Sequence, residues 1–145
     1  MAAERHRPEH QLSVKAASAI NPRSAVQLVG TSELLAIPAA STNLRPFGVT
    51  GGGTAGASGI LSNDQITVYE EGNIVKVRAA ASLGVGAEVG VNSASGGAAG
   101  FSPVTPASLG ASGVAVWSSG QALSPAAAGE YFSLYVKPRL IGGLA

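Results

Sequence analysis

Two histidines near the N-terminus lie in a pattern that can bind zinc. His6 and His10, with Glu9 beside the second, match HxxEH, a zinc-protease spacing that places two imidazoles on one helix face. Pro8 disrupts such a helix, because it lacks an N–H group and clashes with the preceding turn. The chain has only these 2 histidines, so no third imidazole is available to complete the site. We therefore interpret the pattern as solvated terminal charges and expect no bound metal.

A second pattern concerns phosphate binding. Gly51, Gly53 and Gly56 match the dinucleotide fingerprint GxGxxG, and Glu70 follows at about the spacing of the ribose-binding acid. Those glycines must open a helix whose N-terminus holds the pyrophosphate. Residues 57–64 are too short and too turn-like for that helix, and a chain with 20 glycines matches the pattern easily by chance. We therefore expect no cofactor.

Other catalytic arrangements lack their residues. The chain has no cysteine, which excludes thiol nucleophiles, zinc–thiolate sites and disulfides. A serine triad needs a histidine, and both histidines lie in the N-terminal segment. Glu70 and Glu71 are adjacent on an expected turn, where their side chains point to opposite sides. The sequence therefore predicts a protein that is not an enzyme.

Charge limits the partners. The formal net charge is +1 and only 12% of the 145 residues are charged, so no strong field would attract nucleic acid or an anionic membrane. No apolar run approaches the ~20 residues of a membrane-spanning helix. A single small domain with so few charges has little to keep its whole surface solvated. We infer that part of this surface is buried against other chains.

The clearest structural signal covers residues 65–91. Ile66 and Val68 alternate with polar residues, and Val75 and Val77 do the same, as in strands with one buried face. Residues 70–73 contain Gly and Asn, which favour a tight turn, so we predict a β-hairpin. Residues 82–86 turn the chain again, into residues 87–91. A three-stranded meander is the expected nucleus.

The rest of the chain adds short strands. We expect strands in residues 25–29, 34–37, 45–50, 101–106, 113–117 and 130–137, loops in residues 51–59 and 92–100, and one helical turn within residues 118–129. Pro38 and Pro138 are expected to end the strands before them. The prediction is an all-β fold of eight or nine short strands, arranged as a small barrel or sandwich.

The N-terminal residues are expected to form an extended arm. We assign residues 1–23 to this arm, 24–140 to the β-domain and 141–145 to a short tail. Leu12 and Val14 alternate with polar residues, so a short edge strand is possible; a helix over residues 15–20 would be marginal in water. The arm is either a frayed terminus or a segment that adds a strand to a partner's sheet. Its candidate contact residues are Arg5, Arg7, Leu12, Val14, Lys15 and Arg23.

Three aromatic residues are candidates for an interface with other chains, whether copies of this chain or another partner. Trp117 is the sole tryptophan and fits either a core or an interface anchor. Tyr131 and Tyr135 share one face of the expected strand over residues 130–137, opposite the apolar face that carries Phe132.

The order of motifs over residues 47–137 resembles a known family. It comprises FGV at residues 47–49, ITV at 66–68, EGNIVKV at 71–77, LGVGAEV at 83–89 and GEYFSLYV at 129–136. This series resembles the capsid decoration (cement) proteins of tailed bacteriophages.

The resemblance implies a small β-barrel or β-tulip that trimerises and binds the major capsid protein on the outside of the phage head. It implies a virion protein made in the host bacterial cytoplasm, without direct contact to nucleic acid or membrane. The alternatives are another virion part, such as a head-fibre base or a tail decoration, and a small β-barrel ligand-binding domain.

Overall fold

The fold contains strands and one short 3-10 turn. In a computed structural model of the chain, the structure describes residues 4–30, 32–39, 45–51, 60–91, 100–104 and 116–142. The strands are β1 (Gln11–Ala16), β2 (Ala25–Val29), β3 (Leu35–Pro38), β4 (Gly48–Thr50), β5 (Gln65–Tyr69), β6 (Ile74–Arg78), β7 (Glu88–Val91), β8 (Phe101–Pro103), β9 (Val116–Ala122) and β10 (Tyr131–Gly142), with η1 (Pro8–His10) before β1. Within these ranges, no helix has the length and apolarity that a membrane span requires. The all-β prediction is confirmed.

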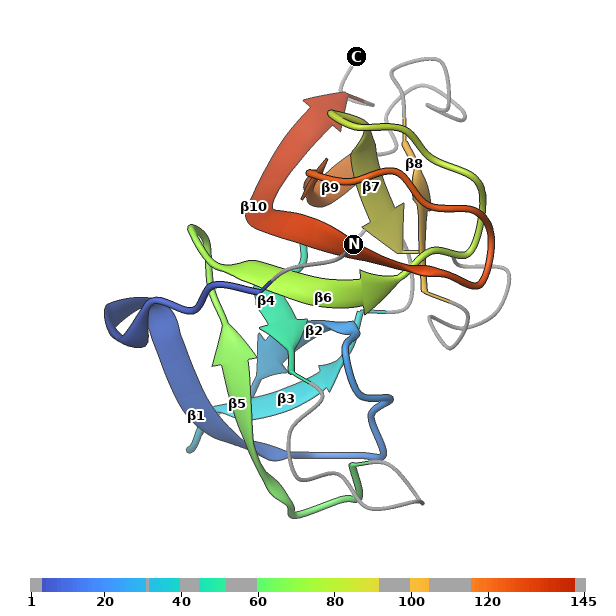
Figure 1. Ribbon diagram of the computed structural model, residues 1–145. Helices are drawn as coiled ribbons and strands as arrows, with labels where there is room; N and C mark the ends of the chain where they lie inside the picture. The colour runs from blue at the N-terminus through green and yellow to red at the C-terminus, as the bar shows by residue number, and fades with distance from the viewer. Residues whose placement is uncertain are drawn as a thin grey trace.

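Five strands form a closed barrel in the order β1-β3-β2-β4-β5. β1 pairs antiparallel with β5 and parallel with β3, so the first strand closes the barrel. Alternate residues point inward, as Ile66 and Val68 on β5 illustrate. The barrel core consists of buried Val14, Ala16, Ile20, Val26, Ala36, Ile60, Ile66 and Val68. The predicted barrel is therefore present, in the lower half of Figure 1.

The other five strands form an open sheet in the order β6-β10-β9-β7-β8, above the barrel in Figure 1. β10 is long enough to pair with β6 through its first half and with β9 along most of its length. The core beneath this sheet contains Phe101 and Phe132, whose rings meet edge to face with centroids 6.5 Å apart. Val49 of β4 belongs to the same core, which joins the barrel to the sheet.

The predicted hairpin is wrong, although its two strands have the predicted bounds. β5 pairs with β1 and β4 in the barrel, whereas β6 pairs with β10 in the sheet. The turn between them is held from outside: Gly72, at φ +97°, donates its N–H to the carbonyl of Val136, and Val136 donates to the carbonyl of Asn73. Residues 70–73 therefore carry the chain from barrel to sheet. The third strand of the expected meander, β7, pairs with β8 and β9 instead.

Two further expectations fail in the last third of the chain. Pro138 does not end its strand, because the register shifts between Val136 and Arg139 and the proline lies where the ladder is interrupted. The helical turn expected within residues 118–129 is also wrong, since β9 continues to Ala122, Ala126 pairs with Leu83, and residues 123–129 contain no helix. Residues 92–99, most of an expected loop, and 113–115 of an expected strand lie outside the described residues.

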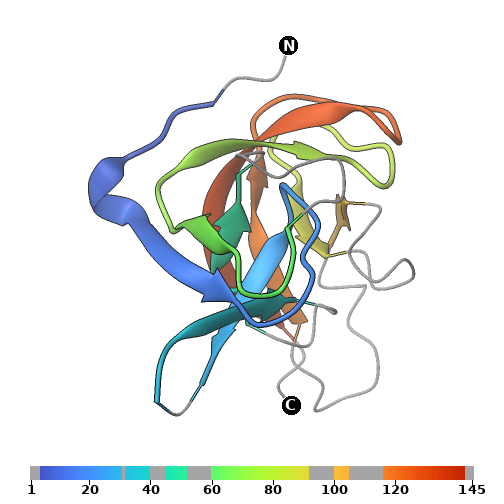
Figure 2. The same ribbon diagram turned by 90° about the horizontal axis from the view of Figure 1, so that it is seen from below.

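The N-terminal segment is part of the fold from residue 11 onward. Val14 and Ala16 lie in the barrel core, and Ile20 pairs with Ile60 through both main-chain hydrogen bonds. The apolar alternation of residues 12–16 therefore belongs to a barrel strand. A free arm would be confined to the residues before β1. Figure 2 shows residues 4–10, in dark blue, at the outer edge of the molecule beyond β6. The proposed boundaries at residues 23 and 140 stay predictions.

Candidate interaction surface

The N-terminal segment covers the free edge of β6. β6 is the last strand of its sheet, so the outward N–H and C=O groups of Ile74 and Lys76 have no neighbouring strand. Arg5 pairs with Ile74 through two main-chain hydrogen bonds, each 2.7 Å long. One residue of the segment thus acts as a short additional strand.

Side chains bind the outward N–H and C=O groups of Lys76, the next residue that faces this edge. The Lys76 N–H donates to Glu4 Oε1 at 2.9 Å, and Arg23 Nη1 donates to the Lys76 carbonyl at 2.7 Å. Glu4 and Arg23 also pair with each other, at 2.6 Å between Oε1 and Nη1. The ion pair therefore replaces a strand beside Lys76. Charge-assisted hydrogen bonds of this kind are stronger than neutral ones.

An exposed tyrosine lies next to this ion pair. The Tyr131 side chain is 50% exposed, with Lys76 Nζ 5.3 Å and Arg23 Cζ 5.9 Å from its ring centroid. Both cations are within cation–π range of one ring. We call Glu4, Arg23, Lys76 and Tyr131 the edge cluster.

A second aromatic contact holds the segment beside the edge cluster. The His6 ring stacks on Tyr69 of β5 at 4.1 Å between centroids, and His6 Nε2 lies 3.9 Å from Glu4 Oε2. Burial of the phenol and the nearby Glu4 charge raise the pKa of Tyr69, against the opposing effect of Arg23. His6 is thus engaged with the barrel rather than with His10.

The electrostatics favour the charged form of Glu4. Partial burial alone raises the pKa of its carboxyl group, but the Lys76 N–H, the Arg23 guanidinium and His6 together outweigh that effect. The net result is a pKa below the ordinary glutamate value. The Arg23 guanidinium and the Lys76 N–H therefore hold the Glu4 carboxylate in its charged form within the edge cluster.

A buried asparagine fixes the segment on the other side of the turn. Asn73 is fully buried; its Oδ1 accepts from the Arg7 N–H at 2.6 Å, and its Nδ2 donates to the carbonyls of His10 and Glu70 at 2.9 and 2.8 Å. His10 Nδ1 also lies 2.6 Å from the Glu71 carbonyl oxygen. The two histidines of the HxxEH pattern thus occupy separate contacts.

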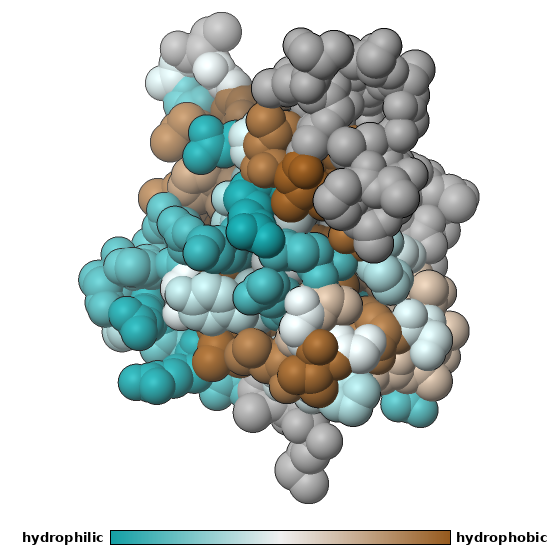
Figure 3. Space-filling view, turned by 90° about the horizontal axis from the view of Figure 1, so that it is seen from above, coloured by the Kyte–Doolittle hydropathy of each residue, from teal (hydrophilic) through white to brown (hydrophobic). Residues whose placement is uncertain are grey.

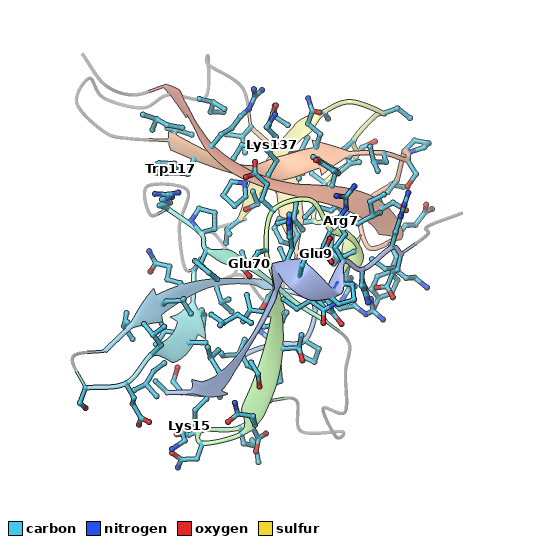
Figure 4. All side chains as sticks on the ribbon, turned by 90° about the vertical axis from the view of Figure 1, so that its left-hand side faces the viewer. Arg7, Glu9, Lys15, Glu70, Trp117 and Lys137 are labelled. Carbon is cyan, nitrogen blue, oxygen red and sulfur yellow. The ribbon has the colours of Figure 1, made fainter. Side chains whose placement is uncertain are left out.

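An open hollow of about 330 Å³ lies beside this junction. It is lined by Glu9, His10, Arg45, Pro46, Phe47, Glu70, Glu71 and Pro138. Figure 4 shows Arg7, Glu9 and Glu70 gathered where the N-terminal turn lies in front of the sheet. In the ranges that the structure describes, no group of three or more His, Asp or Glu side chains is arranged to hold a metal ion. The hollow offers polar and apolar contacts, and it is open to solvent.

The predicted contact residues occupy several places. Arg23 and Tyr131 come together in the edge cluster. Lys15 pairs with Glu33, 3.8 Å apart, and lies at the far end of the barrel from Trp117 (Figure 4). Trp117 is partly buried, with Arg45 Cζ 5.5 Å from its ring centroid.

The remaining candidates differ in exposure. Arg5 and Arg7 are exposed, Leu12 and Tyr135 are partly buried, and Val14 lies in the core. Val14 is thus not at the surface, and the contact roles of the others stay predictions.

Apolar exposure is spread over the molecule. The exposed large apolar side chains include Leu34, Leu61, Val85, Leu123 and Leu140. Figure 3 shows one face, on which hydrophobic areas lie on either side of a hydrophilic band. Single exposed apolar residues are normal on protein surfaces, so these residues do not by themselves define an interface.

Sequence reasoning missed Glu4, Lys76 and Asn73 as the residues that organise this surface. Asn73 has a turn-like sequence context, and its partner Arg7 lies 66 residues away, so no local pattern reveals the contact. The sequence predicts residues 74–78 as the middle strand of a meander, so it gives no signal of a free edge beside Lys76. Of the glycine pattern, Gly53 and Gly56 lie outside the described residues, while Gly51 lies beside the Tyr69 ring.

Comparison with known proteins adds a likeness of fold. No protein-family model and no curated protein matches this sequence. Among solved structures, the chain is similar to the head fiber gp8.5 N base in bacteriophage phi29, with a TM-score of 0.56 and 16% sequence identity. The match covers 88% of this chain and 92% of that chain. At this identity the likeness shows that the two chains share a fold across nearly their whole lengths.

Proposed function

We propose that this chain is a structural protein of a bacteriophage head, of the kind that forms the base of a head fibre. The observation that supports this most directly is the fold shared with a head fiber base over nearly all of both chains. Capsid decoration, which the motif order implies, is the close alternative. A fibre base is preferred because the similar structure belongs to a head fiber.

The surface of the molecule suits a binding role. Main-chain hydrogen bonds and an ion pair attach the N-terminal segment to the β6 edge, and these are contacts that a strand from another chain can also make. The proposal therefore assigns no catalysis and no cofactor to the chain. It places the protein on the outside of the virion as a homotrimer, with the major capsid protein as its partner.

Immunogold electron microscopy of virions from the phage that encodes the chain tests this proposal. Antibody raised against the purified protein should label the head exterior, and quantitative mass spectrometry of the same virions should give its copy number relative to the major capsid protein. Label at a limited set of head positions supports a fibre base. Copies close in number to the capsid subunits would identify a cement protein. Label on the tail, or none on intact virions, would reject the proposal.

A further inference from the structure

Residues 4–7 are attached to the body of the molecule almost entirely through exposed contacts. Every residue from Glu4 to Glu9 is exposed. The attachment consists of the Arg5–Ile74 main-chain pair, the bonds of Glu4, the stacking of His6 on Tyr69 and the bond from the Arg7 N–H. Releasing the segment would therefore uncover no buried apolar side chain of its own.

The point at which the segment could turn away is defined. The His10 carbonyl accepts from Asn73 Nδ2 immediately before β1 begins, whereas the segment before Pro8 is held to Asn73 by one hydrogen bond, from the Arg7 N–H. Residues from 10 onward are thus fixed to the barrel, and the segment before residue 8 is the part that can change its direction. Four extended residues span at most about 14 Å.

The same contacts can form between two copies. A second copy carries an identical β6 edge and an identical Arg23, so its edge accepts Glu4 and Arg5 of the first copy in the same register and with the same charges. An exchange of identical elements keeps every bond of the single chain, and its main cost is the entropy of association.

We propose that residues 4–7 exchange between copies of this chain, so that Glu4 and Arg5 of one copy close the β6 edge of another. Because the segment is so short, two exchanging copies must place their β6 edges side by side. Tyr131 lies at this edge and is half exposed, so the approach covers its ring and adds apolar contact. This inference concerns contacts between copies and holds whether or not the partner is a phage head.

Charge reversal separates exchange from attachment within one chain. Glu4→Arg places two arginines at the pairing position of a single chain, and Arg23→Glu places two glutamates there. When the two variants are co-expressed, exchange brings the arginine introduced at position 4 of one variant to the glutamate introduced at position 23 of the other. The native Glu4 and Arg23 meet in the reverse direction, so both ion pairs are restored between unlike chains only.

Sedimentation and native mass spectrometry of the purified full chain give the result. We expect the wild type to self-associate and each single variant to associate at least about tenfold more weakly, which is 1.4 kcal/mol. Co-expressed variants with tags of different mass should form assemblies that contain both chains. The double variant, Glu4→Arg with Arg23→Glu, restores the ion pair but not the hydrogen bonds of Glu4 and Arg23 to Lys76, so it should recover part of the association that the single variants lose.

A matched control changes a charge elsewhere: Lys15→Glu alters an exposed ion pair at the barrel end and should leave self-association unchanged. Circular dichroism confirms that each variant is folded. Single variants that keep the wild-type mass would show association through another surface and overturn the proposal. A wild type that stays monomeric at its solubility limit would overturn it as well, and so would co-expressed variants that do not combine.

Discussion

Replacing Asn73 by alanine should loosen the junction between barrel, sheet and N-terminal segment. The side chain is fully buried and makes three hydrogen bonds, to Arg7, His10 and Glu70. Each such bond contributes about 0.5–1.5 kcal/mol, and groups that stay buried without a partner cost more. Water reaches part of the junction, because Arg7 is exposed and His10 is only partly buried. We therefore expect a loss of about 2–3 kcal/mol of unfolding free energy.

Urea unfolding followed by the fluorescence of Trp117, the only tryptophan, measures this loss. For a domain of this size, the expected decrease in Tm is about 3 °C per kcal/mol. Asn73→Asp should lose more than the alanine variant at pH 7. It keeps the acceptor for the Arg7 N–H but places a buried negative charge beside two carbonyl oxygens. Trypsin should also cleave after Arg5 faster in both variants, because the loosened segment leaves the β6 edge more often.

Asn21→Ala is the matched control. Asn21 is exposed, and its hydrogen bonds with Ser24 and Thr50 use its main-chain carbonyl, which alanine retains. Its effect should stay within about 0.5 kcal/mol. If Asn73→Ala changed the stability no more than this control does, the junction would not depend on the asparagine. The account of the turn as a fixed crossover from barrel to sheet would then fail.

Two further substitutions, each with a control, test the fold. Gly120→Ala should cost about 3 kcal/mol or more, because Gly120 has φ +153° and an added Cβ would lie 1.9 Å from the Tyr135 carbonyl oxygen. Gly84→Ala, which meets no atom of the described residues within 4 Å, should stay within about 0.5 kcal/mol in the same urea titration. Val14→Ala should lower the free energy of unfolding by about 2 kcal/mol in a thermal unfolding experiment, since it removes buried volume from the barrel. Ser13 is exposed, so Ser13→Ala should lower it by less than half as much. Equal effects would contradict a core position for Val14.

The positions of the strands follow from local pattern, and their partners do not. Alternation at Ile66 and Val68, and at Val75 and Val77, places β5 and β6 at their observed bounds. A Gly-Asn turn between two such strands looks the same whether it closes a hairpin or carries the chain to another sheet. The difference arises from contacts with Val136 and with the N-terminal segment, which are distant in sequence. Local reasoning therefore gave the elements and missed the topology.

The same limit applies to the surface. The alternation around Phe132 correctly places Phe132, Leu134 and Val136 on a buried side of β10 and Tyr131 at the surface, although Ser133 on the Tyr131 side is buried as well. The cations that approach Tyr131 come from other elements, Arg23 before β2 and Lys76 on β6, so no spacing in the sequence brings them together. The sequence predicts a single arm through residue 23, whereas the apolar alternation from Leu12 belongs to the barrel.

Because the chain carries few charges, its sheet edges need protection against pairing with other copies. With 12% charged residues, repulsion between molecules is weak, so an open strand edge would pair readily with other copies. β6 is covered by Glu4, Arg5 and Arg23, while the opposite edge strand, β8, is only three residues long and ends in Pro103. Both are devices that limit uncontrolled edge pairing. They differ in one respect. Pro103 is part of the edge strand itself, whereas the N-terminal segment is held to β6 by an ion pair and hydrogen bonds and can move to the identical edge of another copy.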